Sequence, residues 1–327
     1  MKALVTGGGG FLGRYIAEKL LALGHEVINL SRGQYPELER IGIKTIRCGV
    51  EDAEKVESAV QGVDAVFHVA AKVGVWGGYD DFYRINVTGT RNIIAACRQH
   101  GVKKMVFTSS PSVIFDGKPH EGITEAYPYP KKYLAHYPAT KAIAEREVLA
   151  ASDSELFTCS LRPHLVWGPR DTNLIPRLIQ RAKSGRLRQV GDGSNIIDTV
   201  YVENAADAHI LAAEKLYDGS PVCGSAYFIT QGEPVNCWSF INAVLGKLGL
   251  PPVEKKVSYP VAYAAGAMME AVYSMIGAQS EPPMTRFLAM QLAMSHYFSI
   301  ERAKKELGYV PKIGTEEGLE RLKRSFS

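Results

Sequence analysis

A glycine-rich turn beside the N-terminus constrains the fold of this chain more than any other feature. It occupies residues 6–13, between an apolar run that predicts a buried strand and an amphipathic stretch that predicts a helix. Gly7 allows a tight turn, Gly10 lets backbone N–H groups approach a pyrophosphate, and Gly13 lets the helix pack close to the strand. The helix dipole favours an anion there, although a glycine-rich loop without a ligand is the alternative. The residues expected to bind the anion are Gly7, Gly10, Phe11, Leu12 and Gly13.

Short apolar runs alternate with helical patterns through the first half of the chain. The runs predict strands at residues 3–6, 26–30, 44–47, 65–68 and 104–108. Helical patterns lie between several of them, notably at residues 11–23 and 85–100. Such alternation is typical of an α/β fold, a doubly wound parallel sheet of the Rossmann type with helices on both faces.

The second half of the chain has a different pattern. Strand-like runs alternate with helices up to residue 216, and from residue 259 the chain is mostly helical, with a break at Pro282-Pro283. We expect residues 1–165 to form a nucleotide-binding domain, to which residues 190–225 add a strand and a helix. Residues 166–189 and 226–327 would form a smaller, mostly helical substrate lobe, with a ligand cleft between the two.

The end of the second predicted strand bears on the choice of nucleotide. An NAD(H) site favours an acidic residue there, which accepts a hydrogen bond from the ribose 2′-hydroxyl. This chain has Ser31 and Arg32 instead. The Arg32 guanidinium can form charge-assisted hydrogen bonds to a 2′-phosphate, and the Ser31 hydroxyl can add another. The pair favours NADP(H) over NAD(H), unless Arg32 is only a solvated loop residue.

Tyr137 and Lys141 carry the sharpest chemical signal in the sequence. Pro138 suits the first turn of a helix, and the spacing from Tyr137 to Lys141 places both side chains on one helix face. A phenol with a pKa of about 10 is a poor acid at neutral pH, but a neighbouring ammonium and an oxidised nicotinamide would stabilise its phenolate. We expect Tyr137 to donate a proton to the alkoxide that forms as hydride arrives. Taken alone the spacing is common, and a pair on a surface helix is the alternative.

Several hydroxyl side chains follow the strand predicted at residues 104–108. Ligands of doubly wound sheets lie at the carboxyl ends of the strands, where a serine hydroxyl can hydrogen-bond a substrate oxygen. Ser109, Ser110 and Ser112 all stand at that end. Chemistry alone does not choose among them.

Taken in chain order, these motifs resemble the extended short-chain dehydrogenases/reductases, and segments of the second half resemble their 3β-hydroxysteroid dehydrogenase branch. The likeness includes the run that begins at Asn86, Asn-Val-Thr-Gly-Thr. It selects Ser110 as the catalytic serine beside Tyr137 and Lys141, with Ser112 as the second choice, and it gives Asn86 a supporting role. It also implies that the cofactor cleft is lined by Ala70, Ala71, Tyr137, Lys141, Pro163 and Val166.

Three further positions fall within the resemblance. The family often has an acidic residue near the third strand that contacts adenine, whereas Gly49 stands at that position here. The adenine contact is therefore left without an assigned side chain. For His68 and His164 we expect structural roles.

Segments at residues 35–38, 76–80, 140–145 and 281–288 resemble the bacterial ketoreductases of long-chain olefin biosynthesis. This narrower resemblance implies reduction of a 2-alkyl-3-oxoalkanoate by NADPH, a hydrophobic substrate, and association with other enzymes of that pathway. Look-alikes are commonly homodimers. The apolar stretch at residues 259–275 would wall a hydrophobic cleft, touch a membrane surface, or be an ordinary packed helix. Arg286 or Lys72 would meet the substrate carboxylate.

The composition argues against several other classes of protein. The 38 basic and 34 acidic residues are mixed along the chain, which gives no basic face of the kind that binds nucleic acid. The five cysteines have no CxxC spacing, so we expect no metal site, and reduced thiols in a cytoplasmic protein. No signal peptide is visible in the first residues.

Three other functions stay open beside the ketoreductase hypothesis. A sterol or 3β-hydroxysteroid dehydrogenase would favour oxidation, with NAD(H). A nucleotide-sugar epimerase or reductase would need a more polar C-terminal lobe. A nucleotide-sensing module without turnover would not need Ser110, Tyr137 and Lys141 together.

Overall fold

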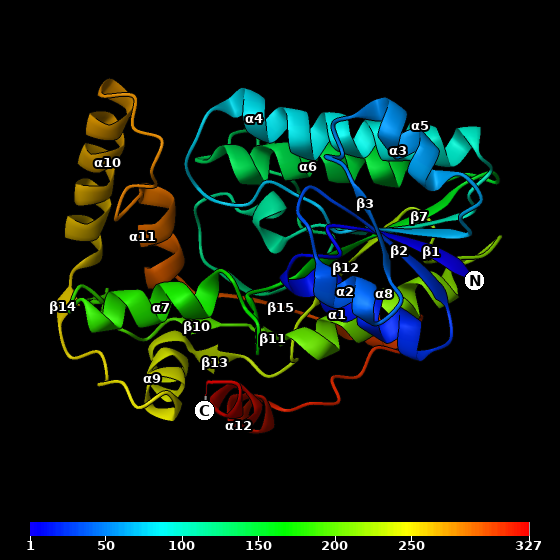
Figure 1. Cartoon of the computed structure of the whole chain (residues 1–327). Coiled ribbons are helices and arrows are strands. Elements are labelled where there is room, and N and C mark those ends of the chain that lie inside the picture. Colours follow the sequence, from blue (N-terminus) through cyan, green and yellow to red (C-terminus); the bar gives the residue numbers. More distant parts are fainter. Residues whose placement is uncertain (327) are drawn as a thin grey trace.

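A parallel sheet forms the centre of the computed structural model, which describes residues 1–326 (Figure 1). Every pairing within this sheet is parallel. Over the described range it has seven strands, in the spatial order β12 (Ser225–Ile229), β7 (Phe157–Pro163), β5 (Lys104–Thr108), β4 (Ala65–His68), β1 (Lys2–Thr6), β2 (Glu26–Ser31) and β3 (Lys44–Arg47). The predicted doubly wound α/β fold is confirmed.

Helices cover both faces of this sheet (Figure 1). One face carries α1 (Phe11–Ala22), α2 (Pro36–Arg40) and α8 (Val202–Lys215). The other face carries α3 (Ala53–Val60), α4 (Tyr79–Tyr83), the π-helical turn η1 (Arg84–Thr88), α5 (Gly89–Gln99) and α6 (His136–Ala150). The strand order reverses between β1 and β4. Ligands of doubly wound sheets bind at the carboxyl ends of the strands beside such a reversal.

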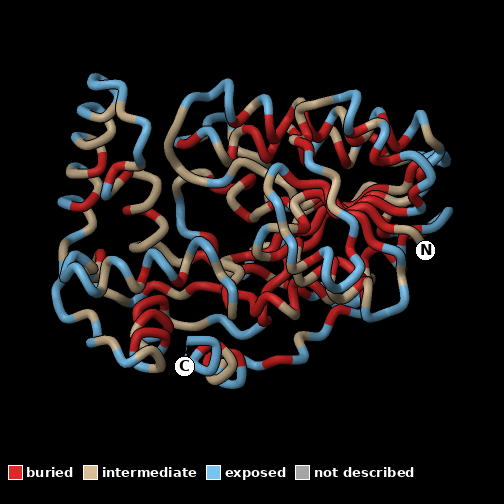
Figure 2. Tube along the Cα trace, in the orientation of Figure 1, coloured by how far each residue is buried: buried red, intermediate tan, exposed pale blue. Residues whose placement is uncertain are grey.

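Apolar side chains at helical spacing hold the helices on the sheet. On one face α1 buries Leu12, Ile16 and Leu20 in a cluster shared with α8. On the other face Val56 of α3 and Ile93 of α5 lie in a second cluster, against the opposite side of the same strands. The strands are therefore buried on both sides (Figure 2), which explains why they read as continuous apolar runs rather than alternating ones.

A second lobe lies beside the carboxyl ends of the strands (Figure 1). Its helices are α7 (Leu174–Lys183), α9 (Cys237–Lys247), α10 (Tyr259–Met275), α11 (Arg286–Ala293) and α12 (Thr315–Arg324). The short turns η2 (Pro111–Ile114) and η3 (Ala303–Leu307) pack instead against the central sheet and its helices. Short strands pair beside the helices of the second lobe: β6 (His120–Ile123), β8 (Val166–Trp167), β9 (Gln189–Val190), β10 (Ile196–Ile197), β11 (Val200–Tyr201), β13 (Val235–Asn236), β14 (Lys256–Val257) and β15 (His296–Phe298). This lobe has its own apolar cluster, which includes Trp167, Trp238 and Phe240.

Two details of the second lobe bear on the sequence predictions. The break expected at Pro282-Pro283 lies between α10 and α11, as predicted. The pairing of β6 with β15 was not predicted, because His-Glu-Gly-Ile has no strand-like alternation and its partner lies more than 170 residues away. Within residues 1–326, no helix is both long enough and apolar enough to cross a bilayer.

Candidate active site

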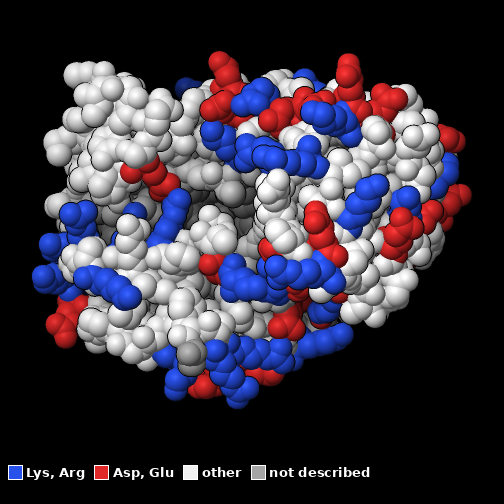
Figure 3. Space-filling view, viewed as in Figure 1, with Lys and Arg blue, Asp and Glu red and all other residues white. Residues whose placement is uncertain are grey.

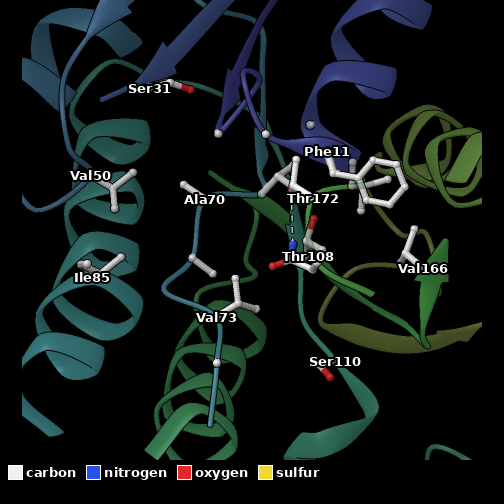
Figure 4. A pocket seen from close by; sticks show the side chains of 18 of the residues that line it. Phe11, Ser31, Val50, Ala70, Val73, Ile85, Thr108, Ser110, Val166 and Thr172 are labelled. Atoms are coloured by element: carbon white, nitrogen blue, oxygen red, sulfur yellow. Dashed lines mark hydrogen bonds between the residues drawn. The ribbon is translucent and has the colours of Figure 1, made fainter. Parts of the chain in front are cut away.

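A cleft of about 820 Å³ opens at the carboxyl ends of the central strands. Figure 4 shows Phe11, Ala70 and Ser110 around it, contributed by α1 and by the segments that follow β4 and β5. All the positions predicted for catalysis or cofactor binding line this cleft, namely Gly7, Gly10, Phe11, Leu12, Gly13, Ser31, Arg32, Ala70, Ala71, Ser110, Tyr137, Lys141, Pro163 and Val166. The hydroxyl of Ser112, the second choice for the serine, is buried outside the lining.

The glycine turn fits the pyrophosphate group that its sequence predicts. Gly7 has a φ of +70°, and a Cβ on Gly13 would lie 2.2 Å from the carbonyl oxygen of Gly7. Larger residues at these two positions would strain the turn or push α1 away from it. No side chain caps the N-terminus of α1, and its first turn has no acidic residue. An anion would therefore meet free backbone N–H groups and a favourable helix dipole.

Thr6 and His68 fix the strand ends on either side of the turn. The backbone N–H groups of Val69 and Ala70 each donate to Thr6 Oγ1, at 3.1 Å. Both acceptor positions of this hydroxyl are thereby filled, so its proton is donated to His68 Nδ1, at 2.7 Å. Burial, followed by the charge of Lys141, lowers the pKa of His68 to about 3. His68 is a neutral structural residue, as expected.

Asn86 extends the same network to the helix that carries Tyr137. His68 Nε2 lies 3.0 Å from Thr90 Oγ1, and Thr90 donates to the backbone carbonyl of Asn86 at 2.7 Å. The Asn86 amide donates to Thr140 Oγ1 in α6, at 3.1 Å. Asn86 thus holds α6 against the segment that follows β4.

Lys141 lies almost completely buried beneath the cleft, with 1% of its surface exposed. Its Nζ donates to the Thr108 carbonyl at 2.7 Å and lies 3.9 Å from the centre of the Phe107 ring. Burial lowers the pKa of Lys141 to about 7, and the carboxylate of Glu145 opposes part of this shift. The ammonium is thus a titrating group near neutral pH.

Tyr137 is half-buried and lines the cleft beside Ser110. Burial raises the pKa of Tyr137 to about 12, which the Ser110 hydroxyl only partly offsets. A neighbouring ammonium would lower the pKa of this phenol, as expected from the sequence. In the chain itself desolvation outweighs this effect, because the ammonium of Lys141 is directed at Thr108. Tyr137 is therefore held as a protonated phenol.

Ser31 and Arg32 lie at the far end of the cleft and differ in their environments. The Ser31 hydroxyl donates to Asn29 Oδ1 at 2.7 Å and accepts from the Gly9 N–H at 3.3 Å. Ser31 thus braces the glycine turn, and its proton is already engaged. Arg32 is exposed at the rim, and no side chain in residues 1–326 pairs with its guanidinium. Arg47 adds a second guanidinium, whose Nε donates to the Arg32 carbonyl at 3.1 Å.

The cleft also has lining residues that the sequence analysis did not assign. Tyr35 covers the glycine turn so closely that a Cβ on Gly9 would lie 2.1 Å from its ring. Asp171 accepts hydrogen bonds from the backbone N–H groups of residues 173–175 and so starts α7, whose Arg177 also lines the cleft. The run Gly-Pro-Arg-Asp that ends at Asp171 was the available signal, since an Asp beside a turn commonly caps a helix.

The two cations expected to meet the substrate carboxylate, Lys72 and Arg286, lie outside the lining of the cleft, and each is paired with an acidic residue. Lys72 Nζ lies 3.1 Å from Asp81, and Arg286 Nε lies 2.6 Å from Glu270. Arg177, by contrast, lines the cleft, with its guanidinium in two hydrogen bonds to Glu281 of 3.1 and 2.9 Å. In the part of the chain that the structure describes, no group of His, Cys, Asp and Glu side chains is placed to hold a metal ion.

The sequence that carries these site residues matches a known protein family. Residues 4–261 match the model of the 3-beta hydroxysteroid dehydrogenase/isomerase family. The chain belongs to this family. It is thus an oxidoreductase of the extended short-chain dehydrogenase/reductase type, as the sequence predicted.

Three known proteins show what this chain is similar to. The chain is 50% identical to the 2-alkyl-3-oxoalkanoate reductase of Stenotrophomonas maltophilia, over 99% of both chains. It is 37% identical to the human sterol-4-alpha-carboxylate 3-dehydrogenase, decarboxylating, over 99% of this chain and 88% of that one. Among solved structures, MoeE5 in complex with UDP-glucose and NAD superimposes with a TM-score of 0.77 at 26% identity, over 99% of this chain and 98% of that one.

The buried position of Lys141 predicts an unusual dependence of stability on pH. The unfolded chain keeps the Lys141 proton up to a pH of about 10, whereas the folded chain releases it near 7. Unfolding therefore takes up a proton at Lys141 between these values, so the contribution of Lys141 to the free energy of unfolding should rise with pH from 7 to about 10. Lys141→Met should flatten this rise and stabilise the ligand-free protein at pH 7.

Urea denaturation at several pH values measures both effects. Lys132→Met, at an exposed lysine, is the matched control and should keep the slope of the wild type. An unchanged slope in Lys141→Met would show that the ammonium is not desolvated in the folded protein.

Proposed function

We propose that this chain reduces the 3-oxo group of a 2-alkyl-3-oxoalkanoate to a hydroxyl group, with NADPH as the hydride donor. One observation carries the proposal. Ser110, Tyr137 and Lys141 meet at one cleft with the glycine turn, in a chain 50% identical over its length to a reductase named for this substrate.

The residues that line the cleft suit each part of NADPH. The turn from Gly7 to Gly13 would hold the pyrophosphate, Arg32 the 2′-phosphate, and the segment at Pro163 and Val166 the nicotinamide. The chemistry that the bound nucleotide supplies is hydride transfer. Ser31 would act indirectly, since its hydroxyl braces the glycine turn.

Tyr137 and Ser110 would act on the substrate oxygen. Both hydroxyls face the cleft, where they can hydrogen-bond the carbonyl and polarise it. A pKa of about 12 keeps Tyr137 protonated at neutral pH. It would give up this proton only when the carbonyl oxygen becomes a strongly basic alkoxide. The Lys141 ammonium beneath the cleft would stabilise the phenolate that is left, until a proton returns from solvent.

The names of two relatives describe substrates that share one arrangement of chemical groups. In a 2-alkyl-3-oxoalkanoate and in a sterol 4-carboxylate oxidised at carbon 3, the carboxylate is attached to the carbon next to the reacting one. A site for either molecule needs a cation close to Tyr137. We assign this role to Arg177, which lines the cleft from α7 and would exchange its partner Glu281 for the substrate carboxylate. Oxidation of a sterol β-hydroxy acid is the second candidate function, favoured by the 37% identity to the human enzyme.

Turnover of NADPH with a panel of substrates tests the proposal. We expect oxidation of NADPH with a 2-alkyl-3-oxoalkanoate, and none with a 3-oxosteroid or a nucleotide sugar. Turnover of only the steroid or only the sugar would refute the proposed substrate.

Tyr137→Phe tests the proton donor in the same assay. It should lower kcat by about 10²–10⁴-fold, the usual contribution of a positioned acid, while the Kd for NADPH stays unchanged. Tyr217→Phe, at an exposed tyrosine, is the control. Full activity in Tyr137→Phe would show that another group supplies the proton.

The choice of nucleotide depends on Arg32. Arg32→Ala should raise the KM for NADPH about ten- to a hundredfold, the value of a hydrogen bond to a charged group, and leave the KM for NADH nearly unchanged. Arg40→Ala, at an exposed arginine in α2, should change neither. Equal effects of Arg32→Ala on both nucleotides would place the guanidinium away from the 2′-phosphate.

The carboxylate contact can be separated from the rest of binding. Arg177→Met should raise the KM for a 2-alkyl-3-hydroxyalkanoate, assayed in the oxidative direction, about tenfold or more, with no change for its methyl ester. Arg181→Met, one turn further along α7, is the control because Arg181 does not line the cleft. A similar loss for acid and ester would mean that Arg177 acts only through α7 and Glu281.

A further inference from the structure

Helix α10 buries only one narrow side. Ala262 and Gly266 face α11, and a Cβ on Gly266 would lie 2.7 Å from the backbone of Thr285. The opposite side exposes Val261 by 58%, Met268 by 64% and Met275 by 85%. Intervals of seven residues place these three side chains on one face of the helix.

This exposed face, which we call the apolar stripe, is completed by other uncharged residues. Its large members are Val261, Met268, Val272, Met275 and Ile276. The one charged residue of α10, Glu270, is turned toward α11, where it accepts hydrogen bonds from the backbone N–H and Nε of Arg286. Figure 3 shows a large uncharged surface at the upper left, where Figure 1 places α10. Contiguous apolar surfaces of this kind are rare on proteins unless they contact something.

Cations gather where α10 begins. Strands β9 and β14 pair at the base of the helix, and Figure 3 shows basic side chains below the uncharged surface. We call these residues the basic base: Lys183, Arg186, Arg188, Lys255 and Lys256, all of them exposed. Within the described range no carboxylate pairs with any of the five, and Glu254 is the acidic residue beside them in the chain.

We propose that the apolar stripe and the basic base together dock this protein on the surface of an anionic lipid bilayer. Methionine, valine and isoleucine side chains would enter the interface between headgroups and acyl chains, while the cations pair with lipid phosphates. The helix would lie on the membrane rather than cross it, because α10, with 17 residues, is too short to span a bilayer.

A second copy of the chain fits this surface less well. In a two-fold dimer with parallel helices, the basic bases would face one another and repel. With antiparallel helices each would face residues 274–280, which carry no charge. Neither arrangement gives the five cations a partner, whereas an anionic membrane does.

The location of the cleft also favours a lipid bilayer as the partner of the apolar stripe. Trp76 lies in the loop that follows the cleft-lining residues Val73 and Gly74. Its Nε1 donates to the Ala278 carbonyl at 2.9 Å, and its ring meets Tyr273 of α10 edge-on. The C-terminal end of the apolar stripe is thus tied to the rim of the cleft. Docking would bring that rim close to the lipid, where a substrate with two alkyl chains partitions; this benefit rests on the proposed function, but docking itself does not.

Flotation of the full chain with vesicles tests the proposal. We expect binding to vesicles of phosphatidylcholine and phosphatidylglycerol, at least about tenfold stronger than to phosphatidylcholine alone, and weakened by 0.5 M salt because surface charge attraction is screened. Met268→Glu with Met275→Glu should abolish binding, and Lys255→Glu with Lys256→Glu should remove the preference for anionic vesicles. Val310→Glu, at a valine 65% exposed away from α10, should bind like the wild type.

Two measurements keep the interpretation distinct from folding and from catalysis. NADPH binding and turnover of a short-chain, water-soluble oxoalkanoate should be the same in all these variants. Failure of the wild type to bind either vesicle overturns the proposal, whether or not it is a reductase. So does a dimer in sedimentation equilibrium that Met268→Glu with Met275→Glu converts to a monomer, since the apolar stripe would then be an interface between copies.

Discussion

A buried chain of hydrogen bonds joins the glycine turn to the helix that carries Tyr137 and Lys141, and the geometry of the cleft depends on it. It runs from Thr6 through His68, Thr90 and Asn86 to Thr140. The direction of proton donation along these hydrogen bonds is fixed at the Thr6 end, because two backbone N–H groups fill both acceptor positions of the Thr6 hydroxyl. Protonation of His68 would place an N–H at Nδ1 against the O–H of Thr6, so that two donors would face each other. Burial prevents this, because it lowers the pKa of His68 to about 3. Each buried group left without a partner would cost about 1–3 kcal/mol, so the network defines one arrangement of three separate segments.

The other end of α6 is fixed by charge rather than by hydroxyl groups. Glu145 follows Lys141 by four residues and lies on the same face of the helix. It is completely buried and accepts hydrogen bonds from Arg162 at 2.7 Å and from Tyr129 at 2.6 Å. A buried ion pair contributes little to net stability, but loss of one partner is costly, so it specifies how α6 is rotated against β7. The carboxylate also opposes the effect of burial on the pKa of Lys141. The same group thus positions the helix and keeps part of the ammonium charge.

Local sequence determined what could be predicted. The glycine turn is recognisable because its constraints, a positive φ at Gly7 and close packing at Gly13, lie within eight residues. The strands of a parallel sheet with helices on both faces were predictable from the alternation of apolar runs with helical patterns. By contrast, the Glu145–Arg162 pair and the pairing of β6 with β15 join distant segments that have no pattern in common. The raised pKa of Tyr137 was missed for a similar reason, since desolvation depends on everything packed around the phenol.

Three cationic side chains lie at different places along the cleft. Arg32 lies at the rim, Lys141 beneath the floor and Arg177 on the wall formed by α7. In the proposed function these cations would meet an anion, a developing phenolate and a carboxylate, respectively. In that function Tyr137 and Lys141 would serve reduction and oxidation equally, because a group that donates a proton in one direction must accept it in the other. Direction must therefore come from the nucleotide. In the proposed function Arg32 selects NADPH, which cells keep mainly reduced, and a site otherwise suited to a β-hydroxy acid dehydrogenase would then work as a reductase.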